Sequence, residues 1–296
     1  MSPETTPLVS ILTPSFNQAA WLGDNLRSVS CQTYPSIEHV VMDGGSTDGS
    51  VKLLEAAAAE EGPKRIRGTS EPDEGQSDAI NKAFRVSKGE IIGWLNSDDA
   101  YLDCHVVEDV VAFFSANPEV DVVYGHAAQT TADGRLIQVL WVPEFDRGLL
   151  GALDFIVQPA AFIRRDALTD PMLDESFHFA MDYELWVRLA DAGRRFARID
   201  RVVAIDRHQA GRKSTTIKNV YRENLARLAE MYPMRLGPEH EAQRSAFYRR
   251  QRLRGARLIP AIRHDRLAFT APEDFKRGVW RRQVLTRRSN WPAEYR

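Results

Sequence analysis

Residues 89–99 of this chain read Gly89-Glu90-Ile91-Ile92-Gly93-Trp94-Leu95-Asn96-Ser97-Asp98-Asp99. The apolar run has the length of a buried strand and ends in an amide, a hydroxyl and two adjacent carboxylates. Open α/β sheets bind ligands beyond the carboxyl ends of their strands, so we expect these acids to face a crevice. Two neighbouring carboxylates repel each other unless a cation lies between them. The stretch therefore indicates a divalent metal with a phosphate-bearing substrate, and a plain acidic turn after a strand is the alternative.

The flanking segments repeat an order of strand and helix, which is typical of a parallel sheet with right-handed crossovers. The predicted strands are Val9–Pro14, His39–Met42, Ile91–Leu95 and Val120–Gly125, and Thr130–Val142 resembles a hairpin that turns at residues 132–134. The predicted helices are Ala19–Gln32, Val51–Glu61, Ser77–Ser87, His105–Ala116, Asp182–Ala192 and one that Pro233 ends. The fold class is therefore α/β, with a mixed, mostly parallel sheet flanked by helices.

The composition is that of a soluble globular protein, with 43% hydrophobic and 27% charged residues among 296. The two cysteines, Cys31 and Cys104, provide no disulfide framework and fit a reducing cytoplasm. The first residues do not read as a secretory signal, and no apolar run reaches the roughly 18 residues of a spanning helix. We therefore expect a cytoplasmic protein without a membrane span.

The net charge of −2 conceals an uneven distribution, because residues 244–296 hold 15 of the 39 Lys and Arg but only four of the 41 Asp and Glu. This predicts two units, residues 1–215 and a basic, mainly helical C-terminal extension over residues 216–296. The basic run fits a solvated helical face, an oligomer contact or, with Trp280 and Trp291, docking on an anionic membrane surface. Nucleic-acid binding is disfavoured because no recognisable binding module accompanies the arginines.

Polar residues that could bind a nucleotide follow several predicted strands. Thr13, Ser15 and Asn17 lie at the end of the first, Asp43 follows the second, and Asp98 and Asp99 follow a later one. Recurrence at the same edge of one sheet is stronger support for a binding site than any single residue.

Five ordered segments make the chain resemble the family 2 inverting glycosyltransferases of the GT-A fold, from about Val9 to about Ser214. These segments are Val9-Ser10-Ile11-Leu12-Thr13-Pro14-Ser15-Phe16-Asn17, Asp43-Gly44-Gly45-Ser46-Thr47-Asp48-Gly49-Ser50, Asp73-Glu74-Gly75-Gln76-Ser77-Asp78-Ala79-Ile80-Asn81-Lys82-Ala83, Asn96-Ser97-Asp98-Asp99 and Met181-Asp182-Tyr183-Glu184-Leu185-Trp186-Val187-Arg188. The resemblance implies a GT-A domain with a Rossmann-like, nucleotide-binding sheet. It also implies transfer of a sugar from a nucleotide-diphosphate sugar of the UDP or dTDP type.

The resemblance further implies which residues bind the donor. They are Thr13, Pro14, Ser15, Asn17, Asp43, Gly45, Asp73, Gln76, Asp78, Asn96, Ser97 and Asp98. The Asp43 carboxylate would accept a hydrogen bond from a pyrimidine N–H, since a carboxylate is an acceptor only. For Ser46 and Asp48, capping of the following helix is the alternative, and Gln76 and Asp78 also fit the start of a helix.

The same resemblance implies a site for Mn²⁺ or Mg²⁺ at Asp98 and Asp99. Asn96 replaces the first acid of the motif Asp-x-Asp, so it would support the cation only through its amide oxygen. His208 is a third candidate ligand, and a structural histidine is the alternative at that position.

Asp182 is the candidate general base, because it opens a predicted helix whose positive end favours the ionised carboxylate. Glu184 is the reserve base, and Gln158 is expected on the acceptor side, near the end of a strand. The implied reaction is a metal-assisted single displacement that inverts the anomeric carbon. The chain lacks the Gln-x-x-Arg-Trp signature of processive relatives, which favours addition of one sugar at a time.

The expected acceptor is a hydroxyl of a glycan or of a lipid-linked glycan in cell-surface polysaccharide biosynthesis, which places the reaction at the inner face of the membrane.

Two other functional classes of protein remain open. A nucleotidyltransferase would show a Gly-rich basic loop after its first strand, and residues 13–20 contain none. A non-catalytic carbohydrate-binding relative would have lost Asp182 or the acidic pair. Kinases and dehydrogenases are disfavoured, since neither a Walker loop nor a Gly-x-Gly-x-x-Gly occurs.

Overall fold

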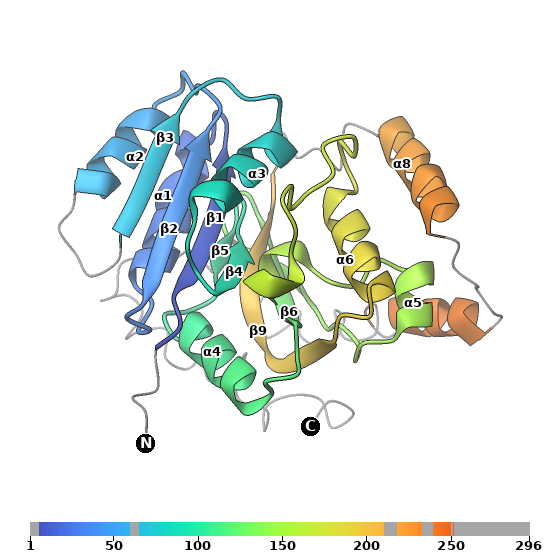
Figure 1. Cartoon of the computed structure of the whole chain (residues 1–296). Helices are drawn as coiled ribbons and strands as arrows, with labels where there is room; N and C mark the ends of the chain where they lie inside the picture. The colour runs from blue at the N-terminus through green and yellow to red at the C-terminus, as the bar shows by residue number, and fades with distance from the viewer. Residues whose placement is uncertain (1–5, 60–64, 210–217, 233–238, 250, 252–296) are drawn as a thin grey trace.

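The computed structural model describes residues 6–59, 65–209, 218–232, 239–249 and 251 (Figure 1). Its strands are β1 Val9–Ser15, β2 Ile37–Asp43, β3 Arg65–Ser70, β4 Ile91–Trp94, β5 Ala100–Tyr101, β6 Val122–Thr131, β7 Leu136–Leu140, β8 Ala161–Arg164 and β9 Phe196–His208. Its α-helices are α1 Ala19–Ser30, α2 Ser50–Ala59, α3 Gln76–Val86, α4 Val106–Ala116, α5 Arg147–Ala152, α6 Met181–Asp191 and α8 Lys218–Met231. Short 3₁₀ helices, η1 Gln158–Ala160 and η2 Arg165–Ala167, flank β8.

The strands form one nine-stranded mixed sheet in the order β3-β2-β1-β4-β8-β6-β9-β5, with β7 paired to β6. The half formed by β3, β2, β1 and β4 is parallel, as the alternating sequence pattern predicts. From β1, the chain adds β2 and β3 on one side and then returns to add β4 on the other side of β1. The register places Ser15 beside Asp43, so the carboxyl ends of β1 and β2 are level. This edge is where an open α/β sheet binds its ligand.

Helices cover both faces of the sheet, and successive residues of the central strand β1 reach opposite faces. Leu12 packs in one core cluster with Phe84 of α3 and Trp186 of α6. Ile11 packs in a second cluster with Phe114 of α4. Because successive side chains of a strand point to opposite faces, a run that is apolar at every position is the sequence signature of such a two-sided strand.

The parallel strands at β1, β2 and β4, the helices of the first 116 residues and the β6–β7 hairpin confirm the predictions, with boundaries within a few residues. The strands β3, β5, β8 and β9 and the helix α5 lie outside the predicted elements. One placement was wrong: Gln158 does not end a strand but begins η1, ahead of β8. Proline at position 159 explains this, since its ring suits a first helical turn.

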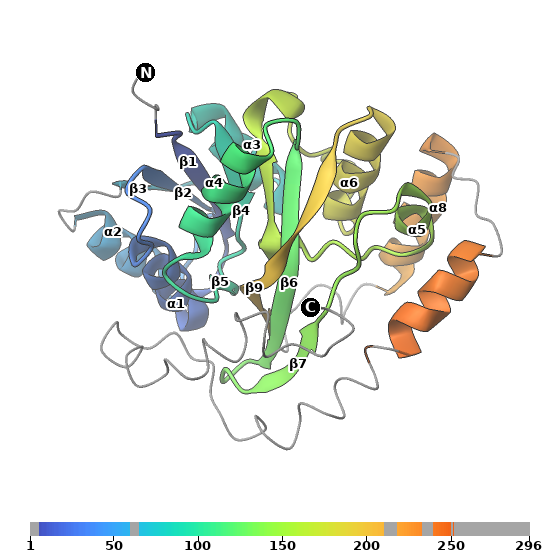
Figure 2. The same cartoon turned by 90° about the horizontal axis from the view of Figure 1, so that it is seen from below.

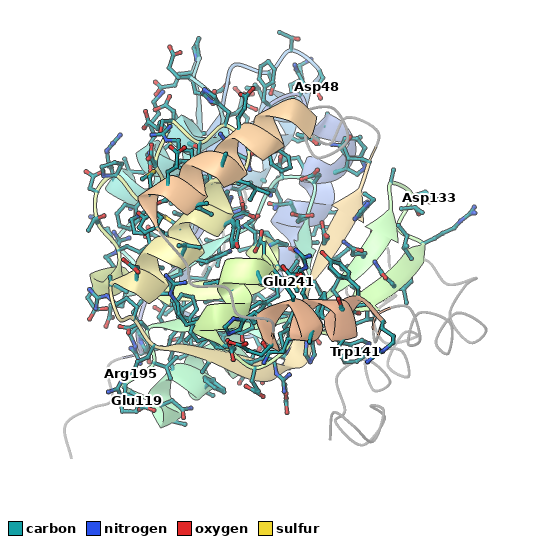
Figure 3. The ribbon with its side chains drawn as sticks, turned by 90° about the vertical axis from the view of Figure 1, so that its right-hand side faces the viewer. Asp48, Glu119, Asp133, Trp141, Arg195 and Glu241 are labelled. Carbon is teal, nitrogen blue, oxygen red and sulfur yellow. The ribbon has the colours of Figure 1, made fainter. Side chains whose placement is uncertain are left out.

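The described part of the C-terminal extension packs on the same core as the preceding domain. Leu228 of α8 is buried in the cluster that holds Trp186, and the Tyr232 hydroxyl donates to Glu184 Oε1 at 3.0 Å. Figures 1 and 2 show α8 and the helix over residues 239–249 outside α6 and α5. Figure 3 shows Trp141 beside that second helix, and Gln251 Nε2 donates to the Trp141 carbonyl at 2.8 Å.

Most of the predicted basic surface, including Trp280 and Trp291, lies outside the described residues. The division at residue 215 and the three interpretations of the basic run therefore stay predictions. Within the described ranges, no helix combines the length and the apolarity that crossing a bilayer requires.

Candidate active site

A cavity of about 770 Å³ opens at the carboxyl ends of β1, β2 and β4. The N-terminal ends of α3 and α6 also reach it, through Gln76 and Asp182. Its lining consists of Pro14, Ser15, Phe16, Gln18, Gly44, Asp73, Gly75, Gln76, Ala79, Trp94, Asn96, Ser97, Asp98, Asp99, Asp154, Gln158, Phe179, Ala180, Met181, Asp182 and Gln209. The cavity thus brings together residues from all five sequence segments quoted above, although Gly44 is the one lining residue from the segment Asp43–Ser50.

Asn96 joins the elements around the cavity. Its Oδ1 accepts hydrogen bonds from Gln76 Nε2 at 2.8 Å and from Trp94 Nε1 at 2.9 Å, and its Nδ2 donates to Gln158 Oε1 at 2.8 Å. The amide oxygen proposed as a metal ligand is therefore already occupied by two donors. Asn96 thus connects these elements, and its expected support of a cation stays a prediction. Gln158 lies beside this turn, with its side chain 7% exposed.

The two carboxylates of the motif have different surroundings. Asp99 is 4% exposed, and its Oδ1 accepts the backbone N–H of Arg207 at 3.0 Å. Arg207 also donates from Nε to the Asp98 carbonyl at 2.9 Å and pairs with Asp24 on α1 at 2.9 Å. The Asp98 side chain is half-buried and lines the cavity, where its Oδ2 lies 3.3 Å from Gln209 Nε2. Asp99 thus fastens the turn to β9, and both Asp98 and Asp99 line the cavity.

His208 does not join these carboxylates. Its side chain is 44% exposed, lies 3.8 Å from Asp206 and is outside the cavity lining, and its expected place among the metal ligands stays a prediction. Among the described residues no group of three or more His, Cys, Asp or Glu is arranged to hold a metal. Asp98 and Asp99, which both line the cavity, still fit a hard divalent cation, because Mg²⁺ commonly binds through one or two carboxylates plus phosphate oxygens and water.

The Asp43 carboxylate is used within its own turn. The side chain is 2% exposed; Oδ1 accepts from the N–H groups of Gly45 and Ser46 and from Ser70 Oγ, and Oδ2 accepts from Ser46 Oγ at 2.6 Å. Asp43 is outside the cavity lining, and its expected contact with a pyrimidine stays a prediction. The turn needs Gly45, whose φ of 83° is costly for residues with a Cβ.

Thr13 and Asn17 also support the cavity from behind. Thr13 is fully buried, where its Oγ1 donates to the Leu95 carbonyl at 2.8 Å and contacts His39 Nε2 at 2.9 Å. Burial lowers the pKa of His39 to about 3, so this pair is uncharged. The backbone N–H of Asn17 donates to Ser46 Oγ at 2.7 Å, which ties the loop after β1 to the turn after β2. These contacts brace the two loops, and the expected contact of both residues with the donor stays a prediction.

Pro14, Ser15 and Asp73, three of the residues expected to bind the donor, line the cavity. The Ser15 hydroxyl is buried and has no hydrogen-bond partner among the described residues, so it is available to a ligand. The Asp73 side chain lies against the backbone of Gly44. A Cβ added at Gly44 would lie 2.7 Å from Asp73 Oδ2. Burial raises the pKa of Asp73. Asp78, in contrast, pairs with Lys82 at 3.0 Å outside the cavity and has the helix-start role.

Asp182 lies in the first turn of α6, half-buried and lining the cavity, and its Oδ1 accepts the N–H of Tyr183 at 2.9 Å. Glu184 is not available as the reserve base. It is 1% exposed, pairs with Arg188 at 2.9 Å and accepts from the hydroxyl of Tyr232. Its position two residues along a helix turns it away from the side of Asp182, toward the core.

Sequence reasoning missed Asp154, which lines the same cavity just after α5. Its side chain is exposed in the cavity. Desolvation by the surrounding protein, together with the charge of Asp182, raises the pKa of Asp154. The sequence signal that could have indicated Asp154 was its position between two apolar residues, Leu153 and Phe155, which are both buried.

Several known proteins are similar to this chain. The profile of the family described as "Glycosyl transferase family 2" matches residues 10–170. The chain is 31% identical over 190 residues to the O-antigen biosynthesis protein RfbC of Myxococcus xanthus, which covers 63% of this chain and 15% of that protein. It is 29% identical over 223 residues to a PGL/p-HBAD biosynthesis glycosyltransferase of Mycobacterium tuberculosis, covering 75% and 84%. The matched region is thus only 15% of the length of the Myxococcus protein, whereas it is 84% of the length of the Mycobacterium protein.

Two solved structures share the fold. S. aureus TarS 1-349 in complex with UDP-GlcNAc aligns with a TM-score of 0.59 and 19% identity over 75% of this chain and 66% of that one. Mannosyltransferase PcManGT from Pyrobaculum calidifontis, in complex with GDP-Man and Mn²⁺, aligns with a TM-score of 0.60 and 19% identity, covering 95% and 81%. These likenesses confirm the predicted GT-A fold.

Proposed function

The chain belongs to glycosyl transferase family 2, and on this premise we propose that it transfers a single sugar from a nucleoside-diphosphate sugar to a hydroxyl acceptor with inversion. One observation carries the proposal. A single cavity holds Asp98 after the central strand β4 and Asp182 at the start of α6, so a metal-binding carboxylate and a base serve one reaction space.

The charge of the cavity supports a cation-assisted donor site. Five aspartates and no Lys, Arg or His occur among its described lining residues. A diphosphate would be repelled there unless a positive ion accompanied it. Asp98 would hold Mn²⁺ or Mg²⁺, and the helix starts at Gln76 and Asp182 add the positive ends of two helix dipoles. When bound, such a cation neutralises the charge that develops on the departing diphosphate.

The residues of the chain supply the remaining steps. Ser15 and Asp73 contact the donor from the edge of β1 and from the loop before α3. Asp182 accepts the proton of the acceptor hydroxyl while that oxygen attacks the anomeric carbon, so the configuration inverts and no covalent enzyme intermediate forms. Gln158 and Asn96 keep the turn that carries Asp98 in register with α3. Binding both substrates in one cavity gives the orientation that the displacement needs.

The acceptor is proposed to be a glycan or a lipid-linked glycan in cell-surface polysaccharide biosynthesis. Support comes from relatives that include the O-antigen biosynthesis protein and a chondroitin synthase of Pasteurella multocida, 32% identical over 191 residues. Reaction at the cytoplasmic side of the membrane, with docking through the basic extension, belongs to the same proposal.

A thermal-shift screen tests the donor site. UDP, dTDP and GDP are each added with Mn²⁺ or Mg²⁺, and uridine serves as the control that lacks phosphates. We expect at least one diphosphate to raise the melting temperature, and only with the metal, since a ligand at 100 times its Kd stabilises the native state by about 2.7 kcal/mol. No shift with any of the three diphosphates would contradict the proposed function.

A further inference from the structure

The two cysteines of the chain meet at the C-terminal end of α1. Cys31 caps this helix, and its Sγ lies 3.0 Å from the Sγ of Cys104, 73 residues away in sequence. Both residues carry thiols and both are half-buried, so neither is sealed in the core. Because the 296 residues include only two cysteines, a disulfide within one copy of this chain must join these two.

Hydrogen bonds hold the backbones of the two cysteines side by side. The Thr33 N–H donates to the Cys104 carbonyl at 2.7 Å. The neighbouring Gln32 is buried, donates from Nε2 to the Asp103 carbonyl at 2.7 Å and accepts the Val107 N–H at 3.0 Å. The residues that follow the first cysteine are thus bound to residues on both sides of the second. The folded backbone itself therefore keeps the two sulfur atoms close.

The same two segments also meet nearer the cavity. Asn25, on α1, donates to the carbonyls of Asn96 at 2.9 Å and Asp99 at 3.3 Å. Further along the helix, Ser28 Oγ accepts the Tyr101 N–H at 3.2 Å. Helix α1 therefore runs beside one continuous stretch of chain, from the turn after β4 to the second cysteine. A bond between the sulfur atoms would covalently fasten one end of a contact that hydrogen bonds already make.

We propose that Cys31 and Cys104 form a reversible disulfide with an oxidant of the disulfide class, such as oxidised glutathione. The thiolate of one cysteine attacks a glutathione sulfur, which breaks the oxidant's S–S bond, forms a mixed disulfide and releases one glutathione thiolate. The thiolate of the other cysteine then attacks the protein sulfur of the mixed disulfide and releases the second glutathione thiolate. Two protein thiols are oxidised, one oxidised glutathione is reduced, and the two thiol protons pass to the released glutathione thiolates.

The contact between the sulfur atoms favours the second step. Once one cysteine carries glutathione, the other already lies beside it, so closure is an intramolecular reaction between positioned groups. We therefore expect the mixed disulfide to be short-lived in the wild type.

The disulfide would stabilise the region that carries the acidic pair. It would link positions 73 residues apart, and such a link stabilises a native state mainly by restricting the unfolded chain. Disulfides in a reducing compartment are usually transient and redox-sensing. The pair would thus be a redox-responsive fastening of α1 against the turn after β4. This inference goes beyond sugar transfer and does not depend on it, because neither cysteine belongs to the described cavity lining.

Intact-mass spectrometry tests the bond in the full chain, without donor or metal. The protein is treated with oxidised glutathione at about pH 8, where ordinary thiols are partly ionised. We expect the wild-type monomer to lose the mass of two hydrogens and to regain it with dithiothreitol. Cys31→Ser and Cys104→Ser are matched controls, and each should carry one glutathione instead. A wild type that stays unmodified, that ends with glutathione adducts or that forms disulfide-linked dimers would overturn the inference.

Thermal melting of the same samples tests whether the native fold accommodates the bond. We expect the oxidised wild type to melt about 5 °C above the reduced form, and dithiothreitol to reverse this rise. The glutathione-treated serine variants should show no such rise, because neither can close the link. An oxidised wild type that melts at or below the temperature of the reduced form would show that the fold does not place the two sulfur atoms for this bond. The wild-type comparison is decisive by itself, even if a serine variant does not fold.

Discussion

Asp182→Asn is expected to lower the rate of sugar transfer by about 10²- to 10⁴-fold, the usual contribution of a general base. An amide of the same shape can still accept the Tyr183 N–H, so the first turn of α6 is preserved. It cannot accept the acceptor's proton. Glu184 offers no replacement, because it is buried and paired with Arg188.

The measurement is the release of nucleoside diphosphate from a nucleotide sugar identified by the donor screen, with nucleotide affinity followed in parallel. Asp191→Asn is the matched control, since Asp191 ends the same helix and forms an exposed pair with Arg147 at 3.1 Å. We expect the control to transfer normally, and both variants to bind the nucleotide as the wild type does. Transfer by Asp182→Asn at a rate near that of the wild type would show that another group is the base.

Asp98→Asn and Asp99→Asn are expected to separate binding from stability. Asp98 is half-buried and faces the cavity, so replacing it should weaken metal-dependent nucleotide binding by about 100-fold and leave the melting temperature unchanged. Asp99 is buried against Arg207, so its replacement by an amide removes the negative charge that strengthens this hydrogen bond and should lower the free energy of unfolding by about 1 kcal/mol.

Calorimetric titration with UDP and Mn²⁺ measures the first effect, and denaturant unfolding measures the second. Each variant is the control for the other, because both remove one carboxylate from adjacent positions. The assignment would be wrong if Asp98→Asn bound UDP and Mn²⁺ as the wild type does, or if Asp98→Asn were the unstable variant.

The sequence was sufficient for the parts of the fold that local patterns determine. β1, β2 and β4 are apolar runs that end in turn-forming residues, and this pattern locates the carboxyl edge of the sheet without knowledge of the rest. The resemblance then correctly selected the segments that meet there.

Patterns of hydrophobicity did not predict the long strand β9. Its buried side chains include Arg201 and Arg207, which a pattern of hydrophobicity assigns to the surface. They are buried because Arg201 pairs with Asp103 and Arg207 pairs with Asp24, 98 and 183 residues away in sequence. Such pairing depends on the assembled sheet, which the sequence pattern does not reveal.

The individual roles of acidic residues were equally hard to predict. Asp43 and Asp99 lie at the expected edge, and neighbouring N–H groups donate to their carboxylates. Asp154 reaches the cavity from a segment without a recognisable motif. A sequence indicates which residue types gather at an edge, whereas the direction of each carboxylate depends on a few local hydrogen bonds.

The central claim is that Asp98 anchors a divalent cation beside a diphosphate in this cavity. Anomalous scattering from Mn²⁺ in a crystal grown with UDP tests it most directly. We expect the manganese peak in direct contact with the Asp98 carboxylate and with oxygens of the diphosphate, on the side of the cavity formed by β1 and β4. A diphosphate bound elsewhere, or a manganese ion that does not contact Asp98, would contradict the account.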